Sequence, residues 1–153
     1  MKKILLSHNE KVLLIDDEDY ELVRTLNLHI QKNERRVYVF YKGKTTSLAR
    51  VLVDVPSHLE IDHINHNPLD NRRKNLRTCS RLQNEANKPP GKNNTSGYKG
   101  VYWEKKEMKW VARIKENRKN IRLGSFKSKV KAAKAYNEAA KRIHGEFAWL
   151  NPV

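Results

Sequence analysis

Apolar side chains near the start of the chain recur over short distances and predict small, separate elements. The apolar runs at residues 3–7 and 11–15 predict two short strands, or one hairpin with its turn at residues 8–10. Residues 16–27 open with four acids and continue with apolar side chains at helical spacing. Because acids in a first turn complement the helix dipole, we expect a helix there.

The next stretch changes from alternation to a short helical pattern. Residues 35–53 predict two strands joined by a turn at Gly43, followed by a helix near residues 47–53. Pro56 ends that piece. The near-neutral charge of residues 1–45 indicates a scaffolding role for this part of the chain.

Residues 60–87 are much more polar than their surroundings. Residues 69–77 predict a turn into a short strand, and residues 80–87 predict a helix with Ser80 as its cap. Because such a polar stretch cannot build a large core, we expect its side chains to be arranged around a ligand. Its apolar anchors are few: Ile61, Ile64, Leu69, Leu76 and Leu82.

The last third of the chain predicts a sheet and one helix. Residues 89–96 are rich in proline and small polar residues, which predicts a linker. Three runs from residue 98 onward alternate apolar and polar side chains, the pattern of a three-stranded antiparallel sheet. An alanine-rich helix follows and should stop at Gly145. The residues expected to form its core are Ala132, Ala133, Tyr136, Ala139, Ala140 and Ile143, with Phe147 and Trp149.

These elements predict an α+β fold in two domains. The first, residues 1–88, would hold N-terminal strands and short helices that lead into a strand–strand–helix motif at residues 60–87. The second, residues 97–153, would be the three-stranded sheet packed on one helix, and the linker would join the two.

The charge of the chain indicates a polyanionic partner. The formal net charge is +15, from 32 Lys and Arg against 17 Asp and Glu. Residues 1–40 are neutral in sum, and the excess grows toward the C-terminus. A single cysteine, Cys79, excludes an intrachain disulfide and a thiolate zinc cage. No apolar run is long enough to span a membrane, so we expect a cytoplasmic protein.

The polar stretch holds the side chains that phosphodiester hydrolysis needs. Histidine is partly neutral near pH 7, so His63 is a candidate general base. Asp62 offers an anionic oxygen and Asn84 an amide oxygen, ligands that hard cations such as magnesium prefer. On an extended segment adjacent side chains diverge, so Asp62 and His63 should point to different sides.

The same stretch resembles the HNH homing endonucleases of phages and group I introns. The matching patterns are DH-I-N, LDNR..NLR and a helical QN..N. The resemblance implies that Asp62 and Asn84 bind one Mg²⁺ or Mn²⁺ and that His63 is the general base. It also implies that Asn75 braces the loop and that Arg81 touches the cleaved phosphate. Four further residues match the motif and are equally consistent with scaffolding or with DNA contact: Asp70, Asn71, Arg72 and Arg77.

Three features leave alternatives open. His63 and His66 form an HxxH pair that would suit zinc, although further soft ligands are missing nearby. The four acids at residues 16–19 are either a helix start or a metal site. The segment LAR at residues 48–50 stands where the resembled family commonly has LHR, so Ala49 bears on substrate positioning or rate.

Residues 96–151 contain a YKGV opening, an LGSF strand end, an AAKAYNEAA helix and a terminal LN. With these motifs they resemble the ethylene-response-factor (apetala-type) DNA-binding domain, in whose fold the sheet enters the major groove. The resemblance implies that one side-chain set of the sheet faces DNA while the other faces the helix. For Trp103 and Trp110, packing in the sheet–helix core is the alternative to DNA contact. The expected DNA contacts are Lys99, Trp103, Lys105, Trp110, Arg113, Lys115 and Arg122.

We therefore expect a metal-dependent DNA endonuclease whose sites are selected by a C-terminal DNA-binding module. The partner would be double-stranded DNA, with no membrane and no evident protein partner, and the chain would act as a monomer. If it is encoded by a phage, it would act in the cytoplasm of the bacterial host. The alternatives are a DNA-binding regulator with an inactive HNH domain and a basic nucleic-acid protein of another kind, such as an RNA-binding one.

Overall fold

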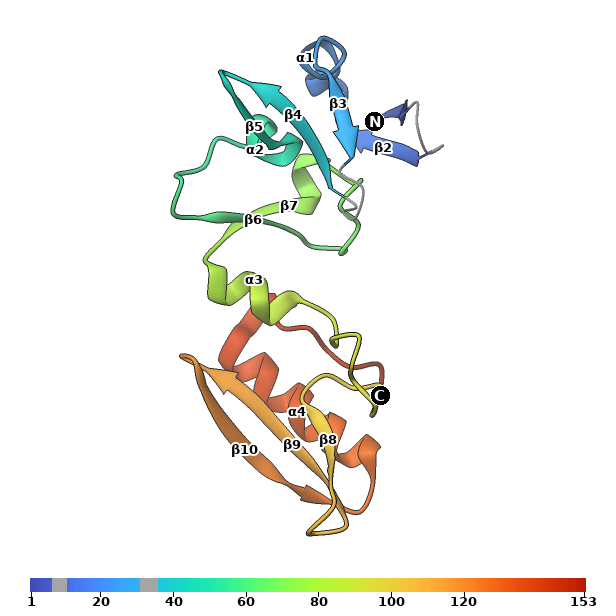
Figure 1. Ribbon diagram of the computed structural model, residues 1–153, viewed down its shortest axis with the longest axis vertical. Coiled ribbons are helices and arrows are strands. Elements are labelled where there is room, and N and C mark those ends of the chain that lie inside the picture. Colours follow the sequence, from blue (N-terminus) through green and yellow to red (C-terminus); the bar gives the residue numbers. More distant parts are fainter. Residues whose placement is uncertain (7–10, 31–35) are drawn as a thin grey trace. The chain divides into compact units, whose positions relative to one another are not determined.

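The computed structural model describes residues 1–6, 11–30 and 36–153, and it confirms the α+β class (Figure 1). The chain divides into two compact units, Met1–Arg81 and Leu82–Val153. Each unit is described by itself below. The turn expected at residues 8–10 lies outside the described residues.

The first unit contains three small sheets. β1 pairs with β2, β4 lies between β3 and β5, and β6 pairs with β7, all antiparallel. Its main core is aliphatic and lies among the first two sheets and helix α2. The elements are β1 (Lys2–Leu6), β2 (Lys11–Ile15), η1 (Asp17–Asp19), α1 (Tyr20–Val23), β3 (Leu28–Ile30), β4 (Val37–Tyr41), β5 (Lys44–Ser47), α2 (Leu48–Leu52), β6 (Glu60–His63), η2 (Arg73–Asn75) and β7 (Leu76–Cys79).

Two elements near the N-terminus differ from their predictions. The helix expected over residues 16–27 is one 3₁₀ turn followed by the four-residue α1. The strand β3 was not predicted, because three residues are too few to show an alternating pattern. The strands and helix predicted over residues 35–53 are present as β4, β5 and α2.

The strand–strand–helix order predicted for residues 60–87 is present as β6, β7 and α3 (Arg81–Asn87). Ile61 and Leu76 are buried in a small cluster with Ala49. Ile64 and Leu82, in contrast, are 45% and 49% exposed, so the expectation that they anchor the motif was wrong. The hairpin is therefore packed through α2 rather than by a core of its own.

The second unit is a three-stranded sheet with a helix against one face (Figure 1). Every predicted alanine of the helix is buried against the sheet, as is Tyr136, and Phe147 is buried as well. Gly145, at a φ of 54°, ends the helix where the sequence placed its stop. The elements after α3 are β8 (Val101–Glu104), β9 (Lys109–Glu116), β10 (Lys119–Phe126), α4 (Lys129–His144) and η3 (Gly145–Phe147).

Gly100 shows how closely the helix approaches the sheet. Its φ is +74°, and a Cβ placed there would lie 2.2 Å from the Tyr136 ring and 2.5 Å from the carbonyl oxygen of Arg113. Only glycine satisfies both the backbone conformation and the contact.

The segment predicted as a linker is held against the second unit. Ser96 is 2% exposed, and its Oγ lies 2.8 Å from the carbonyl oxygen of Val101. The Asn94 side-chain amide donates to the carbonyl oxygen of Tyr98 at 2.9 Å. The compact units divide earlier, after Arg81.

Candidate functional site

Asp62 and His63 lie on opposite faces of the β6–β7 hairpin. Asp62 is in register with Arg77, and His63 is in register with Leu76. Both side chains are buried, at 6% and 9% exposure. The divergence expected for neighbours on a strand is therefore present, and the two side chains address different surroundings.

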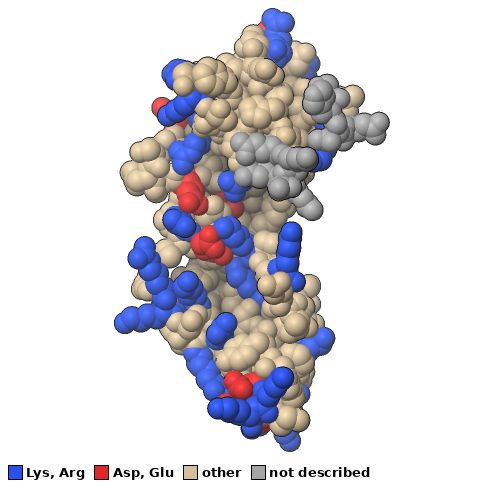
Figure 2. Space-filling model, in the orientation of Figure 1, with Lys and Arg blue, Asp and Glu red and all other residues tan. Residues whose placement is uncertain are grey.

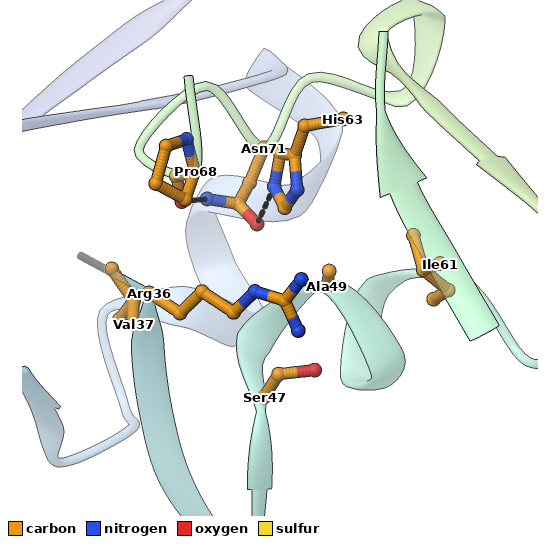
Figure 3. A pocket seen from close by; sticks show the side chains of 8 residues that line it. All are labelled: Arg36, Val37, Ser47, Ala49, Ile61, His63, Pro68 and Asn71. Atoms are coloured by element: carbon orange, nitrogen blue, oxygen red, sulfur yellow. Dashed lines mark hydrogen bonds between the residues drawn. The ribbon is translucent and has the colours of Figure 1, made fainter. Parts of the chain in front are cut away.

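His63 faces a pocket in the first unit, where it meets the side chain of Asn71 (Figure 3). The His63 Nε2 lies 3.4 Å from the Asn71 Oδ1, and the Asn71 Nδ2 donates to the carbonyl oxygen of Pro68 at 3.2 Å. The second contact fixes the orientation of the amide, so an acceptor oxygen faces the ring. A neutral His63 then carries its proton on Nε2 and leaves the lone pair on Nδ1.

The surroundings of His63 favour its neutral form. Burial lowers the pKa of His63 from its usual value of 6.5, and the positive charge of Arg36 lowers it further. The hydrogen bond with Asn71 and the charges of Asp62 and Asp70 oppose this but do not reverse it. At neutral pH the imidazole is therefore able to accept a proton.

Asn75 ties the loop after His63 into a fixed shape. Its Oδ1 accepts from the Asn65 N–H at 3.0 Å, and its Nδ2 donates to the carbonyl oxygen of Asp70 at 2.7 Å. Its own carbonyl oxygen accepts from the Ile64 N–H at 2.9 Å. The side chain is 6% exposed, so this residue braces the loop rather than facing solvent.

The loop is also fastened to the N-terminal strands. The Leu14 N–H donates to the Leu69 carbonyl at 2.8 Å, and the Asn71 N–H donates to the Leu14 carbonyl at 2.8 Å. Asp70, 1% exposed, holds the Arg72 guanidinium at 2.6 Å. Scaffolding, one of the two readings of these motif residues, is what the structure shows for Asp70, Asn71 and Arg72. It also gives β2 a role, because Leu14 positions the loop.

The four acids at residues 16–19 are engaged within the first unit. Asp16 accepts from the Arg73 N–H at 2.7 Å, and Glu18 and Asp19 each pair with the Arg73 guanidinium at 2.7 Å. Asp17 pairs with the N-terminal ammonium. The acids thus hold the 3₁₀ turn η2, which directly precedes β7, and the alternative of a metal site gains no support from their placement.

Asp62 is paired with a neighbouring arginine. Its Oδ2 accepts from the Arg77 guanidinium at 2.9 Å and 2.8 Å. Over the described ranges, no three or more His, Cys, Asp and Glu side chains gather as metal ligands. A metal here would therefore need hard oxygen ligands besides this one carboxylate, the kind of donor that Mg²⁺ prefers.

The other predicted nuclease residues lie on α3 and in the turn after β6. Asn84 is buried and belongs to the second unit, whereas Arg81 is exposed and ends the first unit. That Asn84 shares a metal with Asp62 stays a prediction. His66 is exposed, with its N–H donating to the His63 carbonyl at 2.9 Å. The buried thiol of Cys79 has its pKa raised to about 11 by burial, so it stays protonated.

In the second unit, the strand register separates the two faces of the sheet. Trp110, Ala112 and Ile114 of β9 pack in the clusters formed with α4. Because side chains alternate, Arg113 and Lys115 lie on the opposite, outer face. Arg122 shares that face, since it is directly in register with Arg113.

The two tryptophans lie on the helix side of this sheet. Trp110 packs against Val101 and Ala112, and Trp103 is its partner in the register, with the two rings 5.2 Å apart and edge-to-face. Their packing supports the alternative of a place in the sheet–helix core, and their DNA contact stays a prediction. Trp103 keeps 38% exposure at the edge of that core.

Lys99 makes hydrogen bonds within the second unit that the sequence did not predict. Its ammonium group donates to the carbonyl oxygens of Glu85, Ala86 and Lys88, at 3.2, 2.6 and 2.6 Å. Burial lowers the pKa of Lys99 to about 8, although carbonyls at the negative end of a helix favour the charged form. Lys99 thus joins α3 to the sheet module, and its predicted DNA contact would compete with this role.

The outer face holds side chains that sequence reasoning missed. Tyr102 lies beneath the Arg113 guanidinium, 4.9 Å from its ring centroid, and Asn120 is in register with Lys115. Glu107 lies in the turn before β9 and pairs with the Arg122 guanidinium at 2.5 Å. Lys105 is exposed in the same turn. Counting alternation outward from Arg113 would have found Tyr102 and Asn120. Figure 2 shows Lys and Arg side chains spread over the part of the molecule that holds β8–β10 and α4.

Comparisons with known proteins match two separate parts of the chain. A family model described as HNH endonuclease matches residues 54–86, and one described as AP2 domain matches residues 96–146. An uncharacterized HNH endonuclease of Acanthamoeba polyphaga mimivirus is 33% identical over 99 residues, which are 65% of this chain and 50% of that protein. Protein 3.8 of Escherichia phage T7 is 33% identical over 94 residues, 61% of this chain and 77% of that protein.

The C-terminal part has plant relatives. Dehydration-responsive element-binding protein 2E of Oryza sativa subsp. japonica is 48% identical over 56 residues, 35% of this chain and 17% of that protein. No solved structure matches the chain. Among the described residues, no helix has the length and apolar character to cross a membrane.

The two matches, in the order that the sequence predicted, define a nuclease-like DNA-binding protein. The chain belongs to the HNH endonuclease family and carries an AP2 domain after its HNH motif, as residues 60–87 and 96–151 predicted.

Proposed function

We propose that this protein is a metal-dependent DNA endonuclease that hydrolyses phosphodiester bonds at sites selected by its AP2 domain. The observation that carries the proposal is His63, a buried histidine kept neutral by its surroundings and oriented by Asn71. A regulator that only binds DNA has no physical need for such a group. The geometry supports Nδ1 as the atom that accepts the proton.

The reaction transfers one proton to His63 and breaks one bond at phosphorus. The Nδ1 lone pair takes a proton from water, and the resulting hydroxide attacks the phosphorus of the scissile phosphodiester. The bond from phosphorus to one deoxyribose oxygen breaks, and that oxygen takes a proton from solvent. Asn75 and Asn71 keep the imidazole in place, and Arg81 is expected to contact the cleaved phosphate.

Asp62 and Asn84 would hold one Mg²⁺ or Mn²⁺, which when bound supplies charge neutralisation at the phosphate. For this, Asp62 shares its carboxylate between the metal and Arg77. This ion pair is also the observation that favours the alternative of a DNA-binding regulator with an inactive HNH domain, because Arg77 competes with a metal for the Asp62 carboxylate.

The dependence of cleavage on pH tests the role of His63. The rate constant kcat/KM should rise with pH through a single pKa below 6.5 and then stay level, because only the neutral imidazole accepts a proton and burial lowers its pKa. The measurement is the nicking rate of a plasmid between pH 5 and 8 at saturating Mg²⁺, with stability checked at each pH. A midpoint above 6.5 would contradict the assignment.

The outer face of the sheet is proposed as the DNA-reading surface, with double-stranded DNA as the partner of a monomer. Arg113, Lys115 and Arg122 would contact bases or phosphates there. The phage relative supports action in the cytoplasm of a bacterial host.

Replacing Arg113 by alanine should weaken DNA binding by about 1–3 kcal/mol if it contacts a base. If it contacts a phosphate, the slope of log affinity against log salt should instead fall by about one. The measurement is a salt series of binding to a cognate and a random duplex. Lys131→Ala, which removes an exposed charge on α4, is the matched control and should change neither quantity comparably.

A further inference from the structure

The pocket beside His63 holds a second charged group. It is lined from four directions: by β4 and the residue before it, by β5 and α2, by β6, and by the loop that follows β6. Its apolar lining includes Val37, Ala49 and Ile61. Its polar groups are the guanidinium of Arg36, the hydroxyl of Ser47, and the side chains of His63 and Asn71 (Figure 3).

Arg36 extends into this pocket. In Figure 3 its guanidinium lies between Ser47 on one side and the His63–Asn71 pair on the other. No acceptor among the described residues contacts it. Five other arginines of the same unit each donate to a carboxylate or a carbonyl: Arg24, Arg50, Arg72, Arg73 and Arg77.

A guanidinium in this position fits a phosphate. Its planar fork donates two parallel hydrogen bonds, which match two oxygens of a phosphodiester. The Ser47 hydroxyl adds a donor at the same pocket. Arg36 and His63 line the same pocket, so both can act on one substrate (Figure 3). Ala49 contributes only a small side chain to the wall of the pocket.

We propose that Arg36, with Ser47, binds a DNA phosphate beside His63 and positions the scissile strand for attack. This inference rests on the proposed endonuclease function. The ligand is a phosphodiester monoanion, and the contact is to its non-bridging oxygens. Arg36 therefore supplies, from outside the HNH motif, a phosphate contact in addition to the one expected of Arg81.

The test uses dimethyl phosphate as the probe and the full chain observed by NMR. In the wild type, the His63 ring resonances should shift saturably on titration. In Arg36→Met the dissociation constant should rise at least about tenfold, because a charge-assisted hydrogen bond is lost. Arg36→Lys should recover part of the affinity. Arg24→Met removes the same charge from an exposed pair with Glu21 and should titrate like the wild type.

Plasmid nicking by the same variants separates the two proposals. Absence of nicking by the wild type would remove the endonuclease function, while the phosphate titration still decides the Arg36 site. If Arg36→Met binds dimethyl phosphate like the wild type, or if Arg24→Met loses as much affinity as Arg36→Met, the site is overturned. A nicking kcat/KM unchanged in Arg36→Met would overturn it as well.

Discussion

Replacing His63 by alanine should lower the rate constant for DNA cleavage by about 10²- to 10⁴-fold, the usual contribution of a general base. The reason is the environment of the ring. His63 is 9% exposed, it meets the Asn71 Oδ1 at 3.4 Å, and its pKa is lowered by burial. The measurement is a single-turnover cleavage of a duplex substrate in Mg²⁺, with DNA affinity measured in parallel.

The expected effect of His63→Ala is on cleavage and not on DNA binding. DNA affinity should change little, because the predicted reading surface lies on the sheet of the second unit. His58→Ala removes an exposed histidine of the same unit and should cleave like the wild type. Equal rates for His63→Ala and the wild type would show that another group takes the proton.

Replacing Asn75 by alanine should destabilise the first unit by about 1–3 kcal/mol, because a buried group that loses its hydrogen-bond partner costs about that much. The Asn65 N–H and the Asp70 carbonyl oxygen lose the amide that now joins them. The measurements are the urea unfolding midpoint followed by circular dichroism and the hydrogen exchange of the Asn65 amide, which should exchange faster.

Asn75→Asp extends this prediction. It keeps an oxygen that can accept from Asn65 but puts a charged oxygen opposite the buried Asp70 carbonyl, so its loss of stability should be at least as large as that of alanine. All three tryptophans belong to the second unit, and their emission should therefore be unchanged in the folded variants. A fully stable Asn75→Ala would show that the loop is held by its other contacts.

The sequence predicted the second unit well because its patterns are long. Eight-residue strands and a sixteen-residue helix show their periods clearly, and Gly145 marks the helix end. For the two tryptophans the sequence left core packing and DNA contact both open, because large aromatic side chains suit either. Only the register of Trp103 with Trp110 separates these readings.

In the first unit the motif residues were predictable and their partners were not. A local pattern names His63 and Asn75, but the contacts that position them come from distant segments. Asp16 and Asp19 meet Arg73 across more than 50 residues, and Leu14 pairs with the loop at Asn71. Arg36 has no motif around it, and only the fold brings it to the pocket of His63.

Nicking of a supercoiled plasmid by the full chain tests the endonuclease proposal most directly. With Mg²⁺ the wild type should convert supercoiled DNA to relaxed or linear product, and chelation of the metal should stop the conversion. Intact supercoiled DNA in both Mg²⁺ and Mn²⁺, under conditions where the protein is folded and binds the plasmid, would contradict the account and leave a DNA-binding regulator in its place.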